Sequence, residues 1–380
     1  MNSKGRVQAL FRGEIPDRVP IGEYSIDSDL VERIIGHETY LRAKAKSKEA
    51  IWDGRRDEVA ESWKADIVEL YRKLPVFDIV NLAAECTAFL PPAGVPKTKY
   101  KKLDDSTYEL ECGEVYKYSE PTRDLVLVKR ADSESIDLTT FKEEPDLTPP
   151  DPSCLEVYDA VLDELRDDFF IVGLSGPEVG LVDLGGTEQT LLQYAMCPEL
   201  VEAVCRRRLA EANFMDAYCK RDGVDAIMWG QDHSYRSGPM ISPEMFRQFA
   251  LPVYQSRVAN AKDALGAWLI KHACGNNWKL LDLYVEAGFD SYQSIQASAG
   301  MDLAEVKQAY GEKLVLWGGV LLELLLSGTI AEVREASRKA IEAGKPGGRY
   351  IFGSTHSIAT GTNYDNFMAM LDEHDKHAAY

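Results

Sequence analysis

The chain has 380 residues, of which 45% are hydrophobic and 28% are charged, so it can bury a large core and fold without disulfide staples. Its formal net charge of −19, from 62 acidic and 43 basic residues, creates a field that repels phosphate backbones and anionic lipid surfaces. We therefore expect no nucleic-acid partner and no attachment to a membrane.

The seven cysteines are scattered at irregular spacings, which is typical of a reducing compartment and not of a disulfide framework. The N-terminus lacks the apolar segment of a secretion signal, and no apolar run approaches the ~20 residues that span a bilayer. We expect a cytoplasmic protein.

Two short apolar runs in the N-terminal part, 18–24 and 76–81, are flanked by helical patterns and predict two strands. Between 95 and 128 the pattern alternates and is broken by turn signals, which predicts a β-hairpin outside the main sheet. The Pro/Asp-rich segment 143–152 then predicts an irregular connector.

The C-terminal half alternates short β-rich runs with longer helical stretches, which is typical of βα units around a parallel sheet. The runs predicted as strands are 169–174, 225–230, 267–272, 289–295, 313–318 and 349–353. With the two upstream runs they make eight strands. The sequence therefore predicts an α/β fold, a single (β/α)8 TIM-barrel domain over 1–380, in which the 95–128 hairpin is an insertion.

Polar, titratable residues follow three of these strands, and in such barrels the reacting groups come from the C-terminal ends of strands. His272 and Cys274 are two apart on an extended strand, so they point the same way and can bind one metal ion. A histidine from another strand end would complete a three-ligand Zn²⁺ site with its fourth position open. His356 is our first choice for this third ligand and His233 our second.

A structural interpretation of the same pair is that His272 is a hydrogen-bonded core histidine and Cys274 a buried, inert thiol. Asp232 and His233 are candidates for a general acid or base, or for orienting a metal-bound imidazole. For Asp232 the alternative is a cap of the turn that follows.

Glu23 and Tyr24, at the end of the first predicted strand, are further candidates for the site, and so is Glu178. Each of the three has a structural or solvated alternative.

Several segments together resemble one known family. They are 6–20 (RVQALFRGEIPDRVP), 238–246 (GPMISPEMF), 272–276 (HACGN), 302–307 (DLAEVK), 317–320 (WGGV), 327–329 (SGT) and 363–367 (NYDNF). Their order resembles the uroporphyrinogen decarboxylase superfamily, which contains that decarboxylase and the zinc-dependent, corrinoid-linked methyltransferases. The resemblance covers nearly the whole chain and implies the barrel fold.

Two segments bear on the branch of the superfamily. Decarboxylases carry an Arg-Gln-Ala-Gly-Arg motif after the first strand, whose arginines hold the substrate carboxylates, whereas segment 21–27 here is IGEYSID. The methyltransferase branch carries His-x-Cys-Gly as zinc ligands, and segment 272–275 matches it residue for residue. The resemblance therefore favours the methyltransferase branch.

The last strand departs from one group of that branch. Members directed at coenzyme M have a cysteine as third ligand where this chain has His356, and decarboxylases also have a histidine there. A neutral imidazole in place of a thiolate leaves the metal a stronger Lewis acid, which suits a methyl ether such as a methoxylated aromatic. A shifted ligand set that uses His233, Asp232 or Glu178 stays open.

The resemblance implies a methyltransferase in which Zn²⁺ held by His272, Cys274 and His356 activates a small substrate. The methyl group would pass between this substrate and the cobalt of a corrinoid (cobalamin), as in O-demethylation. The chain has no Asp-x-His-x-x-Gly segment, so we expect the corrinoid on a separate partner protein.

In this hypothesis Asp232 and His233 orient or protonate the substrate, and Glu23 and Tyr24 line the pocket. One alternative is a metal-free decarboxylase that uses His356 and Asp232, and another is a non-catalytic ligand-binding barrel. A homodimer is compatible with the sequence.

Overall fold

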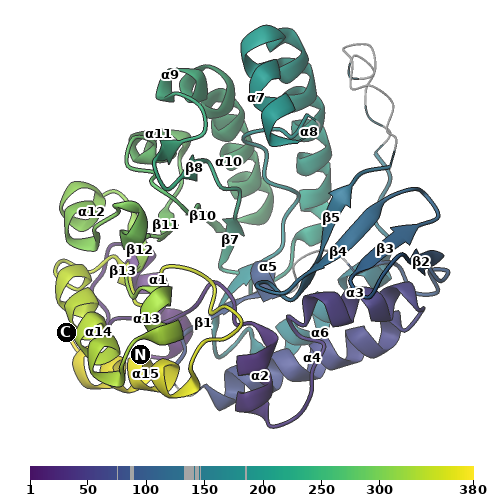
Figure 1. Ribbon diagram of the computed structural model, residues 1–380. Coiled ribbons are helices and arrows are strands. Elements are labelled where there is room, and N and C mark those ends of the chain that lie inside the picture. Colours follow the sequence, from purple (N-terminus) through teal and green to yellow (C-terminus); the bar gives the residue numbers. More distant parts are fainter. Residues whose placement is uncertain (75, 86–89, 132–140, 142–144, 146, 185) are drawn as a thin grey trace.

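The structure, a computed structural model, describes residues 1–74, 76–85, 90–131, 141, 145, 147–184 and 186–380. Among these residues, seven parallel strands form one curled sheet (Figure 1), in the order β1-β6-β7-β10-β11-β12-β13. The strands are β1 (Ile79–Asn81), β6 (Phe170–Gly173), β7 (Ala226–Trp229), β10 (Trp268–His272), β11 (Ser291–Ser294), β12 (Val315–Gly318) and β13 (Tyr350–Ile351). The six strands predicted in the C-terminal half, and the one predicted at 76–81, each contain one of them.

The segment 20–22 lies between the two ends of this sheet. Ile21 forms a parallel bridge with Phe352, whose N–H donates to the Pro20 carbonyl at 2.8 Å. On the other side, the N–H of Asp78 donates to the Ile21 carbonyl at 2.9 Å. Proline has no N–H to donate, so the run predicted as a strand forms single bridges and no ladder. With this eighth position filled, the predicted TIM-barrel class is confirmed.

Helices connect the strands, and most of them cover the outside of the barrel (Figure 1). They are α1 (Ser3–Phe11), α2 (Ser28–Ile35), α3 (Lys44–Trp52), α4 (Arg56–Lys73), α5 (Leu82–Glu85), α6 (Glu156–Leu165), α7 (Thr187–Met196), α8 (Pro198–Cys219), α9 (Pro243–Met245), α10 (Leu251–Leu265), α11 (Leu281–Ala287), α12 (Leu303–Tyr310), α13 (Leu322–Ser327), α14 (Ile330–Gly344) and α15 (Tyr364–His377). In the part of the chain that the structure describes, no helix has the length and apolar character needed to cross a membrane.

A second, antiparallel sheet lies beside α3 (Figure 1), in the order β2-β3-β4-β5. Its strands are β2 (Tyr100–Lys102), β3 (Thr107–Leu110), β4 (Val115–Ser119) and β5 (Asp124–Lys129). Tyr108 and Leu125 pack against Trp52 of α3 in a small core of their own. The predicted hairpin is therefore a four-stranded sheet, because a third chain reversal at 120–123 adds another strand.

Two short segments complete the chain path. A two-stranded pair, β8 (Ser234–Tyr235) and β9 (Gly238–Pro239), follows β7. Of the predicted connector at 143–152, residues 147–151 have no helix or strand, whereas 143, 144 and 146 lie outside the described residues.

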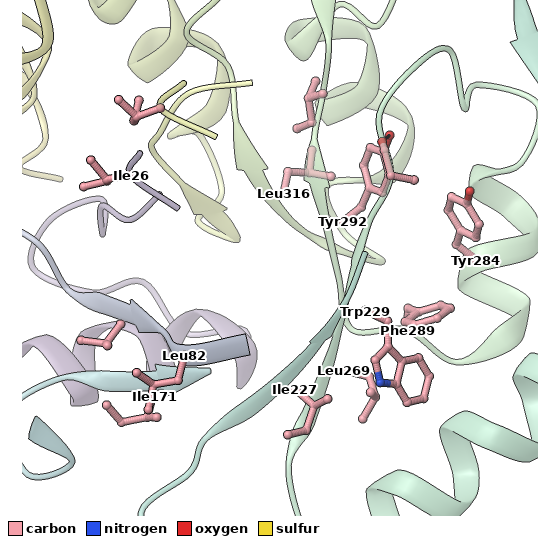
Figure 2. Close-up of a cluster of buried hydrophobic side chains, with 14 of the residues drawn as sticks. Ile26, Leu82, Ile171, Ile227, Trp229, Leu269, Tyr284, Phe289, Tyr292 and Leu316 are labelled. Carbon is pink, nitrogen blue, oxygen red and sulfur yellow. Dashed lines mark hydrogen bonds between the residues drawn. The ribbon is translucent and has the colours of Figure 1, made fainter. Parts of the chain in front are cut away.

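The hydrophobic core has an inner and an outer part. Alternate strand residues such as Ile270 meet inside the barrel, where Val7 of α1 belongs to the same buried cluster. The neighbouring Leu269 belongs to the outer core between strands and helices, together with Trp229 and Phe289 (Figure 2). Since successive side chains on a strand point to opposite faces, this pattern decides which polar residues reach the inside.

Candidate metal centre

Strand β10 brings His272 into the barrel at its C-terminal end. Ile270 lies in the inner core, so His272, two residues later, points the same way. Cys274 follows just beyond the strand, and its Sγ lies 3.5 Å from His272 Nε2. From the end of β7, Asp232 accepts a hydrogen bond from the Cys274 N–H at 2.6 Å. The potential ligand atoms of Asp232, His272 and Cys274 all lie within 4.8 Å of one another.

The hydrogen bonds of His272 suit a metal ligand. Its Nδ1 contacts the side-chain oxygen of Gln293. An amide oxygen only accepts, so Nδ1 carries the hydrogen and Nε2 presents its lone pair toward Cys274. Burial lowers the pKa of His272 to about 4, which keeps the imidazole neutral at pH 7. Neutral imidazole is the form that binds metal ions.

Cys274 is half-buried, and burial together with the Asp232 carboxylate raises the pKa of its thiol to about 12. The Ser294 hydroxyl donates to its Sγ at 3.8 Å. Without a metal ion the thiol is therefore protonated, and a bound metal ion would displace that proton. A neutral imidazole nitrogen, a sulfur and a carboxylate oxygen are donors that Zn²⁺ accepts, so these residues fit this ion.

His356, the first choice for the third ligand, lies at the edge of this group. The centroids of its ring and the His272 ring are 6.5 Å apart, at an interplanar angle of 78°. Its Nδ1 is buried and has no hydrogen-bond partner among the described residues. In the arrangement of the structure, Asp232 is closer to the other two ligand atoms.

His233 lies elsewhere, between the barrel and helices α10 and α11. The hydroxyl groups of Tyr284 and Tyr254 each lie 2.9 Å from one of its ring nitrogens, Nδ1 and Nε2 respectively. The residue is fully buried, and burial holds its pKa well below the usual value. Both nitrogens are engaged, so the structure does not bring His233 to the group around His272.

Tyr24 and Glu23 have different surroundings. The Tyr24 ring lies against the His272 ring, with centroids 4.1 Å apart. A Cβ at Gly230 would come within 2.8 Å of the Tyr24 hydroxyl, so only glycine leaves room for the tyrosine there. Glu23 is buried and accepts hydrogen bonds from the N–H of Ser354 at 3.0 and 3.1 Å. Tyr24 therefore borders the centre, whereas Glu23 joins the first segment to the last strand.

A family model described as uroporphyrinogen decarboxylase (URO-D) matches residues 134–377, which is more than half of the chain. The chain belongs to the uroporphyrinogen decarboxylase family. This confirms the superfamily that the sequence segments resemble, and the matched part includes Asp232, His272 and Cys274.

One solved structure extends the comparison over the full fold. The structure of a methyltransferase from Methanosarcina mazei aligns with a TM-score of 0.62 over 99% of both chains, at 18% sequence identity. At this identity the similarity shows the fold alone. A search of curated proteins finds no match.

A cavity of about 310 Å³ lies beside Asp232 in this chain. Its lining is mostly apolar and consists of Arg130, Leu181, Val182, Asp183, Gly186, Thr190, Leu191, Tyr194, Gln231, Asp232, Met240 and Ile241. The guanidinium of Arg130 already pairs with the Asp183 carboxylate at 2.6 Å. The cavity therefore suits a small neutral group better than a carboxylate.

Two residues near the centre, Gln293 and Lys271, were not predicted from the sequence. Gln293 orients His272, and Lys271 is completely buried beside it. Lys271 is a charged residue inside an apolar strand run, which was the available signal. The run around Gln293, FDSYQSI, contains several polar residues, so Gln293 did not stand out. Their partners come from other elements, so the sequence alone did not show their roles.

Proposed function

We propose that the chain is a zinc-dependent methyltransferase that moves a methyl group between a small substrate and the cobalt of a corrinoid. The observation that carries the proposal is the convergence of His272, Cys274 and Asp232, in which His272 Nε2 presents its lone pair toward the Cys274 sulfur. Bound Zn²⁺ would supply Lewis-acid activation of the atom that carries the methyl group. The similarity in fold to a methyltransferase supports this assignment.

The substrate we propose is a neutral methyl ether such as a methoxylated aromatic compound. The apolar cavity beside Asp232 supports this choice, because its one arginine is already ion-paired. Segment 21–27 also lacks the arginines that would hold a polycarboxylate. Asp232 would complete the zinc ligand set, and Tyr24 would orient the substrate beside His272.

We place the corrinoid on a separate protein, because no Asp-x-His-x-x-Gly segment occurs in the 380 residues. Docking of that partner over the barrel mouth would exclude water from a reactive cobalt centre.

The test is elemental analysis of the purified protein and of Cys274→Ala. We expect about one zinc ion per chain in the wild type and none in the variant, with the circular dichroism spectrum retained. Cys205→Ala is the matched control, because Cys205 is a buried thiol in α8, and it should keep the metal. A wild-type protein that binds no zinc would overturn the proposal and favour a metal-free decarboxylase or a binding protein.

The third ligand is tested by the zinc affinities of Asp232→Asn and His356→Ala, measured by competition with a chromophoric chelator. If Asp232 is the ligand, as we propose, its variant loses affinity and the His356 variant does not. The reverse result would assign the third position to His356.

A further inference from the structure

Lys271 is completely buried in β10, one residue before His272. Because neighbouring strand residues face opposite ways, its side chain leaves the barrel and enters the layer under α10 and α11. Its Nζ lies 2.6 Å from a carboxylate oxygen of Glu178 and donates to the backbone carbonyl of Gln231, also at 2.6 Å. A buried ammonium group is therefore tied to the residue that precedes Asp232.

Glu178 binds the same residue through its other backbone polar group. The backbone N–H of Gln231 donates to Glu178 Oε2 at 2.6 Å, and the Tyr254 hydroxyl donates to Oε1. The Gln231 side chain is also fixed, because its oxygen accepts from the Leu181 N–H at 2.9 Å. The ion pair thus occupies both backbone polar groups of Gln231.

The residues around Asp232 are consequently held on both sides. Gln231, before it, is bound by the ion pair, and His233, after it, lies between two tyrosine hydroxyls. Asp232 itself is exposed, yet it accepts from the Cys274 N–H at 2.6 Å. A fixed backbone lowers the conformational entropy that an exposed carboxylate loses when it forms such a contact.

Stability alone does not explain a buried lysine paired with a largely buried glutamate. Desolvation of two charges costs several kcal/mol, and a well-packed apolar pair at such a place is often as stable or more stable. Hydrogen bonds to charged groups are shorter and stronger than neutral ones, however, and they can hold a neighbouring backbone segment in place.

We propose that Glu178 and Lys271 are positioning residues that hold Asp232 against Cys274, so that the three ligand atoms converge. The inference rests on the proposed function insofar as it takes zinc as the ion that these three atoms bind. The positioning itself is a property of the metal-free chain and can be measured without zinc.

The experiment is hydrogen exchange of the Cys274 amide in metal-free protein, followed by mass spectrometry with single-residue fragmentation. In the charge-free double variant Glu178→Gln/Lys271→Met, this amide should exchange about tenfold faster, because its acceptor is no longer held. Lys4→Met/Asp225→Asn is the matched control, since this ion pair lies at the opposite end of β7 at 2.9 Å. It should leave the exchange unchanged.

A second measurement tests the link to the metal. Zinc affinity should fall about tenfold or more in the double variant, and the loss should vanish when Asp232→Asn is already present. Additive losses would mean a general structural effect and would overturn the inference, as would unchanged exchange of the Cys274 amide.

Two further results distinguish a failure of the proposed function from a failure of the positioning role. A wild type that binds no zinc, combined with faster exchange in the double variant, would overturn the proposed function and leave the positioning intact. Should the double variant not fold, Tyr254→Phe removes one donor to Glu178 and should speed the exchange in the same direction. Unchanged exchange in that folded variant would overturn the inference.

Discussion

The carboxyl group of Glu23 is 1% exposed, and burial raises its pKa to about 8. The hydroxyl of Ser354 contacts both this carboxyl group and the backbone carbonyl of His356. A hydroxyl carries one hydrogen, so a protonated Glu23 can supply the hydrogen for the second contact. Glu23 is therefore a neutral group at pH 7 that connects the two ends of the barrel.

Glu23→Gln should change how stability depends on pH. In the unfolded chain a glutamate has a pKa of about 4.3, whereas the pKa of Glu23 in the folded chain is about 8. Between these two pH values the Glu23 carboxyl group is ionised only in the unfolded chain. Its contribution to the free energy of unfolding is therefore fully present below the lower pH and is lost as the pH rises to the higher one.

The free energy of unfolding of the wild type should consequently fall relative to Glu23→Gln between pH 4.5 and 8, by up to about 5 kcal/mol. Urea unfolding at several pH values measures it, with Glu312→Gln, an exposed site, as the control. Parallel pH curves for wild type and Glu23→Gln would contradict the prediction.

At the scale of elements, the closure of the barrel depends on a segment that is not itself a ladder strand. Gly22 donates its N–H to the Phe352 carbonyl at 3.1 Å, and its own carbonyl accepts from the Trp317 indole at 2.9 Å. A Cβ at this position would lie 2.8 Å from the Ile79 Cβ and 3.2 Å from the Trp317 ring. The close approach of three strands therefore requires glycine.

Gly22→Ala should lower the free energy of unfolding by about 2 kcal/mol, because the added methyl group overpacks the junction. Gly36→Ala is the control, since φ is 92° there and no atom lies within 4 Å of the added Cβ. It should cost only the backbone strain of about 1 kcal/mol. Chemical unfolding compares the two, and a Gly22 variant as stable as the wild type would refute the steric argument.

At the scale of the whole molecule, the barrel and the antiparallel sheet have separate cores. Trp52 on α3 contacts Tyr100, Tyr108 and Tyr116, with ring centroids 5.5, 5.9 and 5.3 Å apart respectively. These contacts lie outside the large core that surrounds the barrel strands. The two parts can therefore differ in local stability.

Trp52→Ala should remove about 3 kcal/mol of packing and loosen the antiparallel sheet. Hydrogen exchange should show lost protection in β3, β4 and β5, while β7 and β10 stay protected and the metal content is unchanged. Trp278→Ala, at a tryptophan that is 39% exposed, should leave both parts protected. Equal loss of protection in β10 would mean that sheet and barrel open as one unit.

Much of the fold follows from local patterns in the sequence. An apolar, β-rich run of a few residues favours an extended strand through its local sequence. Seven of the eight predicted strand runs accordingly contain a ladder strand. The run at 18–24 differs, because its pairing needs both ends of the sheet and Pro20 cannot donate. The sheet at 95–128 gained strands for a similar reason, since turn signals mark reversals but not how many strands pair.

The residues of the metal centre also differ in how far the local sequence predicts them. His272 and Cys274 could be predicted together, because residues two apart on one extended strand point to the same side whatever the rest of the chain does. The position of Asp232 depends on a different strand end, and the Lys271–Glu178 pair joins residues 93 apart in sequence. Local geometry determines what a single strand presents, whereas contacts between distant segments exist only once the barrel has closed.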